Sequence, residues 1–187
     1  IYSMDFRPLY QYHLETGSAM TLMATRLPAD RLSRRFGYPE VDPQSGRLLN
    51  MTEKPDKPLS DLVFTGVALF RREVLVKKLL ENSQIPGMDN LTYHVIVPLA
   101  QELECYAYEH KGYWDYLEHV GRYHQVHMDM AQGKSPIHPG EWDVMTNLAY
   151  RRLGSLQPTS FAPTAEVSDS LISPGAVIAG KVTRSVI

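Results

Sequence analysis

The sequence predicts an α/β fold in which a layered sheet domain is followed by the start of a parallel β-helix. Between residues 1 and 133, short apolar runs bounded by turn residues alternate with helical patterns, as in a sheet covered by helices. Residues 172–177 and 178–183 each begin with isoleucine followed by small residues, and a six-residue period is typical of a triangular parallel β-helix. We therefore divide the chain into a domain at 1–133, a linker at 134–160 and a coil at 161–187.

The composition of the chain argues against several classes of protein, including those that bind nucleic acids or membranes. The chain has 187 residues and a formal net charge of −2, so it shows no basic surface for nucleic acid and no cationic face for a membrane. We find no apolar run of membrane-spanning length and no signal-peptide pattern. Cys105 is the single cysteine, which excludes a disulfide framework and favours a cytoplasmic setting. Its place in an apolar strand indicates a buried structural thiol.

Local patterns predict the elements of the first half. Residues 1–6 are interpreted as a strand that runs out into a loop, and Pro8 suits the first turn of a helix that ends at Gly17. The apolar run at 19–25 indicates a buried strand. Together these form half of a βαβ unit, which predicts a parallel sheet at this point.

Turn signals and apolar spacing predict the rest of the domain. Asp-Pro and Ser-Gly dipeptides mark a hairpin turn between strands at 36–41 and 47–49. Asp89 or Asn90 is expected to cap a helix in which Pro98 marks a kink or an early end. The remaining predictions are a strand at 62–70, an amphipathic helix at 71–81 that packs on the sheet through Val74, Leu75, Leu79 and Leu80, a strand at 105–109 and a helix at 120–131.

A Glu-Lys-Pro motif is the strongest functional candidate. Proline behind Lys54 favours an extended conformation for the Glu53-Lys54 pair. The strand that follows is interrupted by Gly66, and a glycine within a strand often marks close approach by a ligand. A lysine ammonium is a compact point charge suited to a phosphate. The competing interpretation is a solvated surface lysine, which is favoured for such a motif in isolation.

Histidines suggest a metal site less strongly. His119, His124, His127 and His138 occur close together in the sequence, and His124 and His127 would share one helical face. No cysteine or carboxylate cluster completes a closed zinc site. Solvated histidines are the favoured interpretation.

Taken together, several motifs in order along the chain resemble the glucose-1-phosphate adenylyltransferase (ADP-glucose pyrophosphorylase) family of sugar-1-phosphate nucleotidyltransferases. No single motif is decisive, but the set is specific. The matching stretches are residues 1–6, His13, 17–19 with Thr21, 36–37, 53–55, 65–67 with Phe70, 113–114, and 170–173 through 178–180 to 185–186.

The resemblance implies a Rossmann-like nucleotidyltransferase domain joined to a left-handed β-helix, of which this chain would hold the C-terminal half of the domain and the first coils. It implies conversion of ATP and glucose 1-phosphate to ADP-glucose and pyrophosphate, with Mg²⁺ neutralising the triphosphate. Lys54 would hold the sugar phosphate and Glu53 a sugar hydroxyl. Gly37, Thr65 and Gly66 would line the sugar pocket. The parent protein is expected to be a homo- or hetero-oligomer.

Two departures from the family pattern qualify these expectations. The family's glycine-rich phosphate loop, its nucleotide-binding basic residues and its first metal-binding aspartate would precede Ile1, so the chain alone is expected to be inactive. Where the family carries a second aspartate after Tyr-Trp, this chain has Tyr116, and Asp115 is one residue early. Asp115 is thus a metal-ligand candidate only if the backbone slips by one residue.

Two further function classes stay open. The altered aspartate motif favours a non-catalytic paralogue that binds a sugar phosphate and regulates. The hexapeptide period is also found in acyltransferases, although the Glu53-Lys54 motif and the long α/β portion oppose that interpretation.

Overall fold

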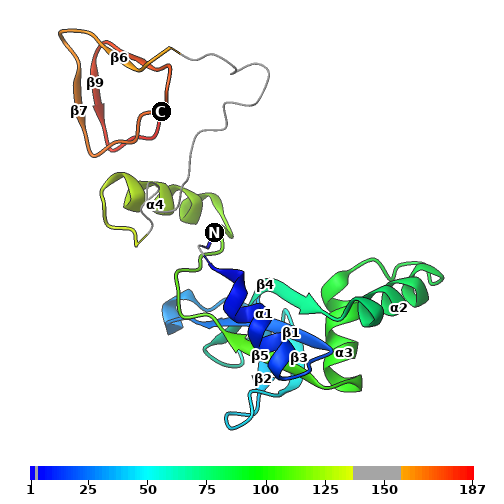
Figure 1. Ribbon diagram of the computed structural model, residues 1–187. Helices are drawn as coiled ribbons and strands as arrows, with labels where there is room; N and C mark the ends of the chain where they lie inside the picture. Colours follow the sequence, from blue (N-terminus) through cyan, green and yellow to red (C-terminus); the bar gives the residue numbers. More distant parts are fainter. Residues whose placement is uncertain (3, 137–156) are drawn as a thin grey trace. The chain divides into compact units, whose positions relative to one another are not determined.

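A computed structural model describes residues 1–2, 4–136 and 157–187 of the chain (Figure 1). The chain forms two compact units. One is Met4–Gly112, and the other comprises Ile1–Ser3 and Tyr113–Ile187. Among the described residues, the helices are too short or too polar to cross a membrane.

The first unit contains most of the secondary structure. Its elements are α1 (Phe6–Glu15), β1 (Met20–Arg26), a 3₁₀ turn (Ala29–Arg31), β2 (Gly37–Val41), β3 (Leu48–Glu53), β4 (Leu62–Phe70), α2 (Arg72–Ser83), the π-helical turn η2 (Thr92–Ile96), α3 (Val97–Glu102) and β5 (Cys105–Glu109). These bounds confirm the predicted strands at 62–70 and 105–109.

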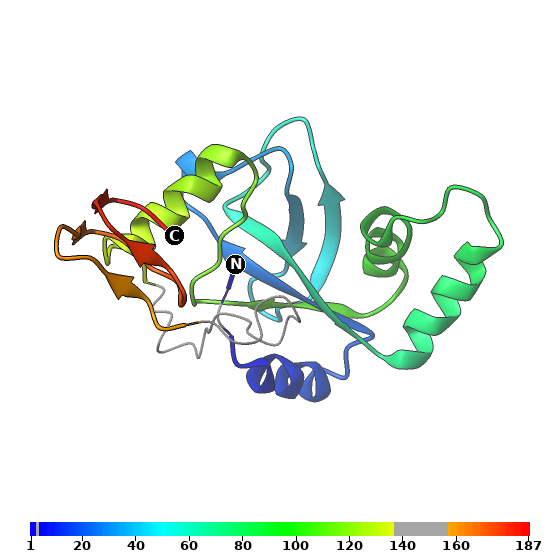
Figure 2. The same ribbon diagram turned by 90° about the horizontal axis from the view of Figure 1, so that it is seen from above.

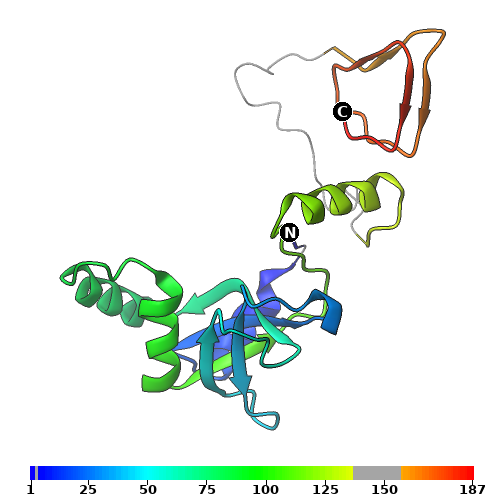
Figure 3. The same cartoon turned by 180° about the vertical axis from the view of Figure 1, so that it is seen from behind.

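Its main sheet has the strand order β4-β1-β5. β1 runs parallel to β5 and antiparallel to β4, so the sheet is parallel on one side of β1 only. The predicted βαβ unit that begins with residues 1–6 is wrong, because the parallel partner of β1 is β5. Helix α1 covers one face of this sheet, and the β2–β3 hairpin lies over the other (Figures 2 and 3). Because both faces are covered, every residue of β1 except Arg26 is buried.

Helix α1 has clear end signals. The Asp5 carboxylate caps it by accepting the Arg7 backbone N–H at 2.9 Å, and Gly17 follows its end with a φ of 58°. Pro8 lies in the first turn, as predicted. The predicted strand at 1–6 is wrong at its end, because the helix already begins at Phe6, whereas Tyr2 forms an isolated bridge with Trp114.

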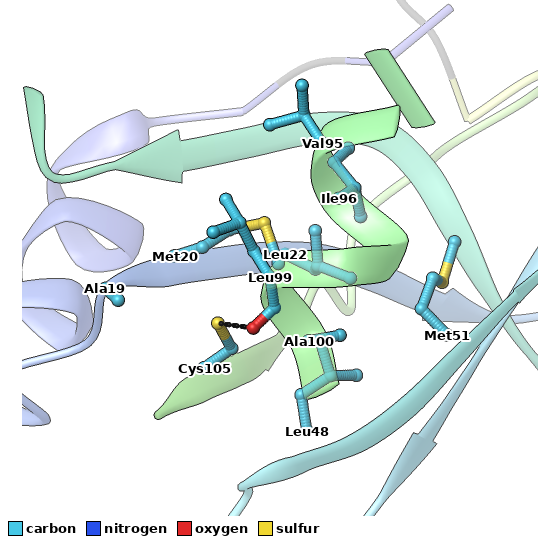
Figure 4. Close-up of a cluster of buried hydrophobic side chains, with 10 residues drawn as sticks. All are labelled: Ala19, Met20, Leu22, Leu48, Met51, Val95, Ile96, Leu99, Ala100 and Cys105. Atoms are coloured by element: carbon cyan, nitrogen blue, oxygen red, sulfur yellow. Dashed lines mark hydrogen bonds between the residues drawn. The ribbon is translucent and has the colours of Figure 1, made fainter. Parts of the chain in front are cut away.

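The core lies between the sheet, the hairpin and α3 (Figure 4). Leu99 and Ala100 of α3 pack against Met20 and Leu22 of β1, together with Ala19, Leu48, Met51, Val95, Ile96 and Cys105. The Cys105 thiol donates to the Leu99 carbonyl at 3.4 Å. Asn90 caps the helical turn that follows it, because its side-chain oxygen accepts the Tyr93 N–H at 3.0 Å.

Helix α2 only partly fits its predicted packing. Val74 and Leu75 pack against the core, as expected. Leu79 and Leu80 are 45% and 63% exposed, so the prediction that they face the sheet is wrong. The inward positions of its second half are instead polar: Lys78 donates to Glu102 at 3.0 Å, and the buried Asn82 side chain donates to the His94 carbonyl at 2.8 Å.

The described residues of the second unit form α4 (Val120–Ala131) and four short strands, β6 (Ser160–Phe161), β7 (Glu166–Ser168), β8 (Val177–Ile178) and β9 (Lys181–Thr183). The predicted helix at 120–131 is confirmed. β6 pairs with β8 and β7 with β9, both in parallel, and Leu171 bridges Val186 in parallel. Successive stretches of this segment therefore stack side by side. Most of the predicted linker, residues 137–156, lies outside the described residues.

Candidate functional site

Glu53 is positioned by the β2–β3 hairpin. The antiparallel register pairs Gly37 with Glu53 at the open end of the hairpin. At the other end, Gly46 adopts a φ of 74° and donates its N–H to the Asp42 carbonyl at 2.9 Å. The predicted turn therefore forms, and it fixes which residue faces Gly37.

Lys54 leaves the strand in an unusual backbone conformation. Its φ is 49°, so the prediction that it is extended is wrong, although Glu53 itself ends β3. Left-handed φ values are uncommon for residues other than glycine and suggest a local constraint. Here the Lys54 N–H donates to the Phe36 carbonyl at 3.0 Å, which ties the residue to the start of β2.

Gly37 makes room for the Glu53 carboxylate. A Cβ at Gly37 would meet the end of the Met51 side chain and lie 2.7 Å from Glu53 Oε2. The same Cβ would lie 3.5 Å from Phe64 Cβ. The Glu53 carboxylate, Gly37 and strand β4 are thus immediate neighbours.

Strand β4 carries a bulge at the predicted glycine. Leu22 pairs with Ala68 and Ala24 with Phe64, so residues 65–67 lie opposite Met23 alone. Gly66 has a φ of 87°, and a Cβ there would meet open space. Thr65 is 9% exposed and its hydroxyl donates to the Met23 carbonyl at 2.8 Å. The positive φ therefore accounts for a glycine at position 66, and no other atom lies within 4 Å of where its Cβ would be.

The two charged groups have different environments. The Lys54 ammonium lies 3.8 Å from Glu53 Oε1, and their side chains are 51% and 10% exposed. Burial raises the pKa of the Glu53 carboxyl above its ordinary value, and the nearby Lys54 charge opposes this shift. A largely buried carboxylate beside an exposed ammonium can accept a hydroxyl hydrogen bond while the ammonium binds an anion.

The structure thus brings five predicted site residues into one region of the first unit. Gly37 and Glu53 are paired, Lys54 follows Glu53, and β4 beside them contributes the bulge with Thr65 and Gly66. Their assigned roles in binding a sugar phosphate stay predictions. Asp115 belongs to the second unit.

Asp115 is held by neighbours that the sequence analysis missed. Its side chain is 1% exposed, and its carboxylate accepts hydrogen bonds from Arg122 and from the Tyr113 hydroxyl. No spacing rule pairs an aspartate in a loop with an arginine seven residues later. The described residues contain no group of three or more histidine, cysteine or acidic side chains arranged to hold a metal.

Two of the four histidines considered for a metal site contact protein groups, and His124 is exposed. His119 caps α4, with its Nδ1 accepting the Arg122 N–H at 3.1 Å, and His127 Nδ1 lies 2.8 Å from the Tyr123 carbonyl. His138 lies outside the described residues.

A pocket of about 490 Å³ lies elsewhere in the first unit. Its lining includes Arg26 and Glu109 at the carboxyl ends of β1 and β5, a common ligand position in α/β sheets. Arg26 pairs with Asp61 at 2.7 Å and with Glu109 at 3.2 Å, so these charges satisfy one another. None of the predicted site residues lines this pocket.

Comparisons with known proteins identify the family of this chain. The chain matches the glucose-1-phosphate adenylyltransferases of Thermotoga neapolitana (30% identity over 192 residues), Desulfitobacterium hafniense strain Y51 (32% over 192) and Clostridium novyi (28% over 191). Each match covers 100% of this chain but 44%, 46% and 48% of the relative, so the chain spans about half the length of these proteins. The family model described as "Nucleotidyl transferase" matches residues 1–133. The chain belongs to the nucleotidyl transferase family.

Proposed function

We propose that this chain is the sugar-phosphate-binding part of a glucose-1-phosphate adenylyltransferase. The observation that carries the proposal is the Glu53-Lys54 pair at the open end of the hairpin, beside Gly37 and the β4 bulge. The names of the relatives supply the substrates, since each is a glucose-1-phosphate adenylyltransferase.

In the proposed reaction, a phosphate oxygen of glucose 1-phosphate attacks the α-phosphorus of ATP. The bond from that phosphorus to the bridging oxygen breaks, and pyrophosphate leaves with the electron pair. The contribution of this chain is binding and orientation. Lys54 would pair with the sugar phosphate, which keeps the attacking oxygen in place. Glu53 would accept a hydrogen bond from a sugar hydroxyl and thereby fix the ring.

The family reaction implies Mg²⁺, which would neutralise the triphosphate. Asp115 is the candidate ligand in this chain. Both of its carboxylate oxygens already accept hydrogen bonds, and its side chain is almost fully buried. Asp115 as it stands does not fit a metal site, so we assign no step to a metal held by this chain.

A non-catalytic, sugar-phosphate-binding regulator is the second candidate. It is favoured by Tyr116, which stands at the position of the expected aspartate. Tyr116 stacks on Trp114 with ring centroids 6.4 Å apart and an interplanar angle of 6°. A phenol is a poor ligand for Mg²⁺ beside a carboxylate.

Calorimetric titration of the 187-residue chain with glucose 1-phosphate, glucose 6-phosphate and glucose tests the binding proposal. We expect glucose 1-phosphate to bind most tightly, because both the phosphate and the ring hydroxyls would be recognised. Equal affinity for all three ligands, or binding of none, would contradict it. Pyrophosphate release by the longer protein that contains this chain then separates the two candidates, since only the enzyme releases pyrophosphate from ATP.

A further inference from the structure

The carboxylate of Asp115 accepts hydrogen bonds from Arg122 and Tyr113. Arg122 Nε donates to Oδ1 at 3.0 Å, Arg122 Nη2 donates to Oδ2, and the Tyr113 hydroxyl donates to Oδ2 at 2.9 Å. The Asp115 side chain is 1% exposed, whereas the Arg122 side chain is 29% exposed. Arg122 and Asp115 therefore form a bidentate ion pair in which the carboxylate is buried.

A bidentate contact of this kind compensates the cost of burying an ionised carboxylate. An ionised carboxylate away from water is strongly unfavourable unless a cation and hydrogen bonds compensate it. The guanidinium supplies both, because its planar fork matches the two carboxylate oxygens. Mg²⁺ would need the same lone pairs and an octahedral shell with several waters. The guanidinium already occupies the place of that cation.

Arg122 is itself fixed at the start of α4. Its backbone N–H donates to His119 Nδ1 at 3.1 Å, in the cap that begins the helix. The same residue therefore links the helix start to the preceding loop. Trp114 and Tyr116, on either side of Asp115, stack on each other while the carboxylate between them binds Arg122. These contacts tie the segment that precedes α4 to Arg122 at both Asp115 and His119.

We propose that Arg122 is the permanent counter-cation of Asp115, a positioning residue that sets the 113–119 segment and keeps divalent cations off this carboxylate. The inference goes beyond the proposed sugar-phosphate site and does not depend on it. It assigns a role to Arg122 and replaces the metal-ligand role considered for Asp115.

A spectroscopic measurement on the unmodified chain tests the proposal directly. In a proton–nitrogen correlation spectrum, we expect a slowly exchanging Arg122 Nε–H signal that keeps its position and width when Mn²⁺ is added. Selective broadening of that signal and of the Asp115 amide by Mn²⁺ would overturn the proposal, because the metal would then be bound at the carboxylate.

A mutant cycle provides the second test, with Asp115→Asn, Arg122→Gln and the double variant. We expect each single variant to lower Tm by about 5–10 °C, as when one partner of a buried pair is removed. The double variant should lose no more than the larger single loss. Additive losses would show that the two residues act independently and would overturn the proposal.

The control for the cycle is Glu81→Gln, which removes an exposed carboxylate of α2 that lies 3.9 Å from the Lys77 ammonium. We expect little change in its Tm. Millimolar MgCl₂, compared with NaCl of equal ionic strength, should leave the Tm of the unmodified chain unchanged. A rise in Tm that Asp115→Asn abolishes would identify Asp115 as a metal ligand and reject the role given to Arg122.

Discussion

Glu53 and Lys54 are consecutive residues whose charged groups lie 3.8 Å apart but in different surroundings. The Glu53 side chain is 10% exposed and packs beside Gly37, whereas the Lys54 side chain is 51% exposed. The hairpin thus fixes a carboxylate and leaves an ammonium accessible next to it. This arrangement suits a ligand that carries both hydroxyl and anionic groups.

Glu53→Gln is expected to stabilise the protein at neutral pH. Burial raises the folded-state pKa of Glu53 above its ordinary value of 4.5. The folded state then keeps its proton to a higher pH than the unfolded state, so ionisation of Glu53 lowers stability as pH rises through this window. Urea unfolding at pH 7 should show a more stable variant, and the difference should shrink near pH 4. A variant that is less stable at pH 7 would contradict this account.

Gly37→Ala is expected to disturb the same carboxylate. The added Cβ would lie 2.7 Å from Glu53 Oε2 and would meet Met51, so both side chains must move. We expect a loss of about 1–3 kcal/mol in unfolding free energy, as for other overpacked sites, together with weaker glucose 1-phosphate binding. Gly180→Ala is the control, because a Cβ there meets nothing within 4 Å. Equal effects of the two substitutions would refute the steric argument.

His13 is expected to make stability depend on pH. It is 7% exposed, and its Nδ1 lies 2.8 Å from the Thr21 hydroxyl. Burial lowers the pKa of His13 from its ordinary 6.5, and the Arg71 charge adds to the effect. The unfolded state therefore takes up a proton first, and stability falls as pH drops below about 6.5.

Chemical unfolding at several pH values checks this dependence. Between pH 7.5 and pH 5.5, the unfolding free energy of His13→Gln should fall less than that of the unmodified chain. The difference should correspond to the uptake of about one proton on unfolding. His124→Gln, at an exposed position on α4, should keep the full dependence. If both variants lose the same unfolding free energy over this pH range, His13 is not the source of the pH dependence.

Cys105 is expected to be chemically inert in the folded protein. It is fully buried, and burial raises the pKa of its thiol to about 11. Because the thiolate is the reactive form, both access and ionisation oppose reaction near neutral pH. A thiol-specific chromogenic reagent should label the chain only after urea is added. Rapid labelling of the native chain would show that β5 opens readily.

The sequence predicts the regular elements well where one local signal dominates. The bounds of β4 follow from a run that is apolar except at Thr65 and Gly66, and those of α4 from helical spacing. The β2–β3 hairpin follows from turn chemistry at Asp42 and Gly46. In these cases tertiary contacts reinforce the local preference.

Features that depend on register or on distant partners could not be predicted. Predicting the bulge at Gly66 would require the strand register, in which residues 65–67 face Met23 alone. The left-handed backbone of Lys54 reverses the preference of a residue before proline, because its N–H is tied to Phe36. The exposure of Leu80 depends on what α2 packs against, which its apolar spacing does not encode.

The most direct test of the central claim is calorimetric titration of Lys54→Gln with glucose 1-phosphate, beside the unmodified chain and the exposed-lysine control Lys57→Gln. If Lys54 holds the sugar phosphate, its replacement should weaken binding by about 1–3 kcal/mol, or roughly 5- to 150-fold, while Lys57→Gln binds as the unmodified chain does. Equal affinities for all three proteins would contradict the claim that this ammonium binds the phosphate.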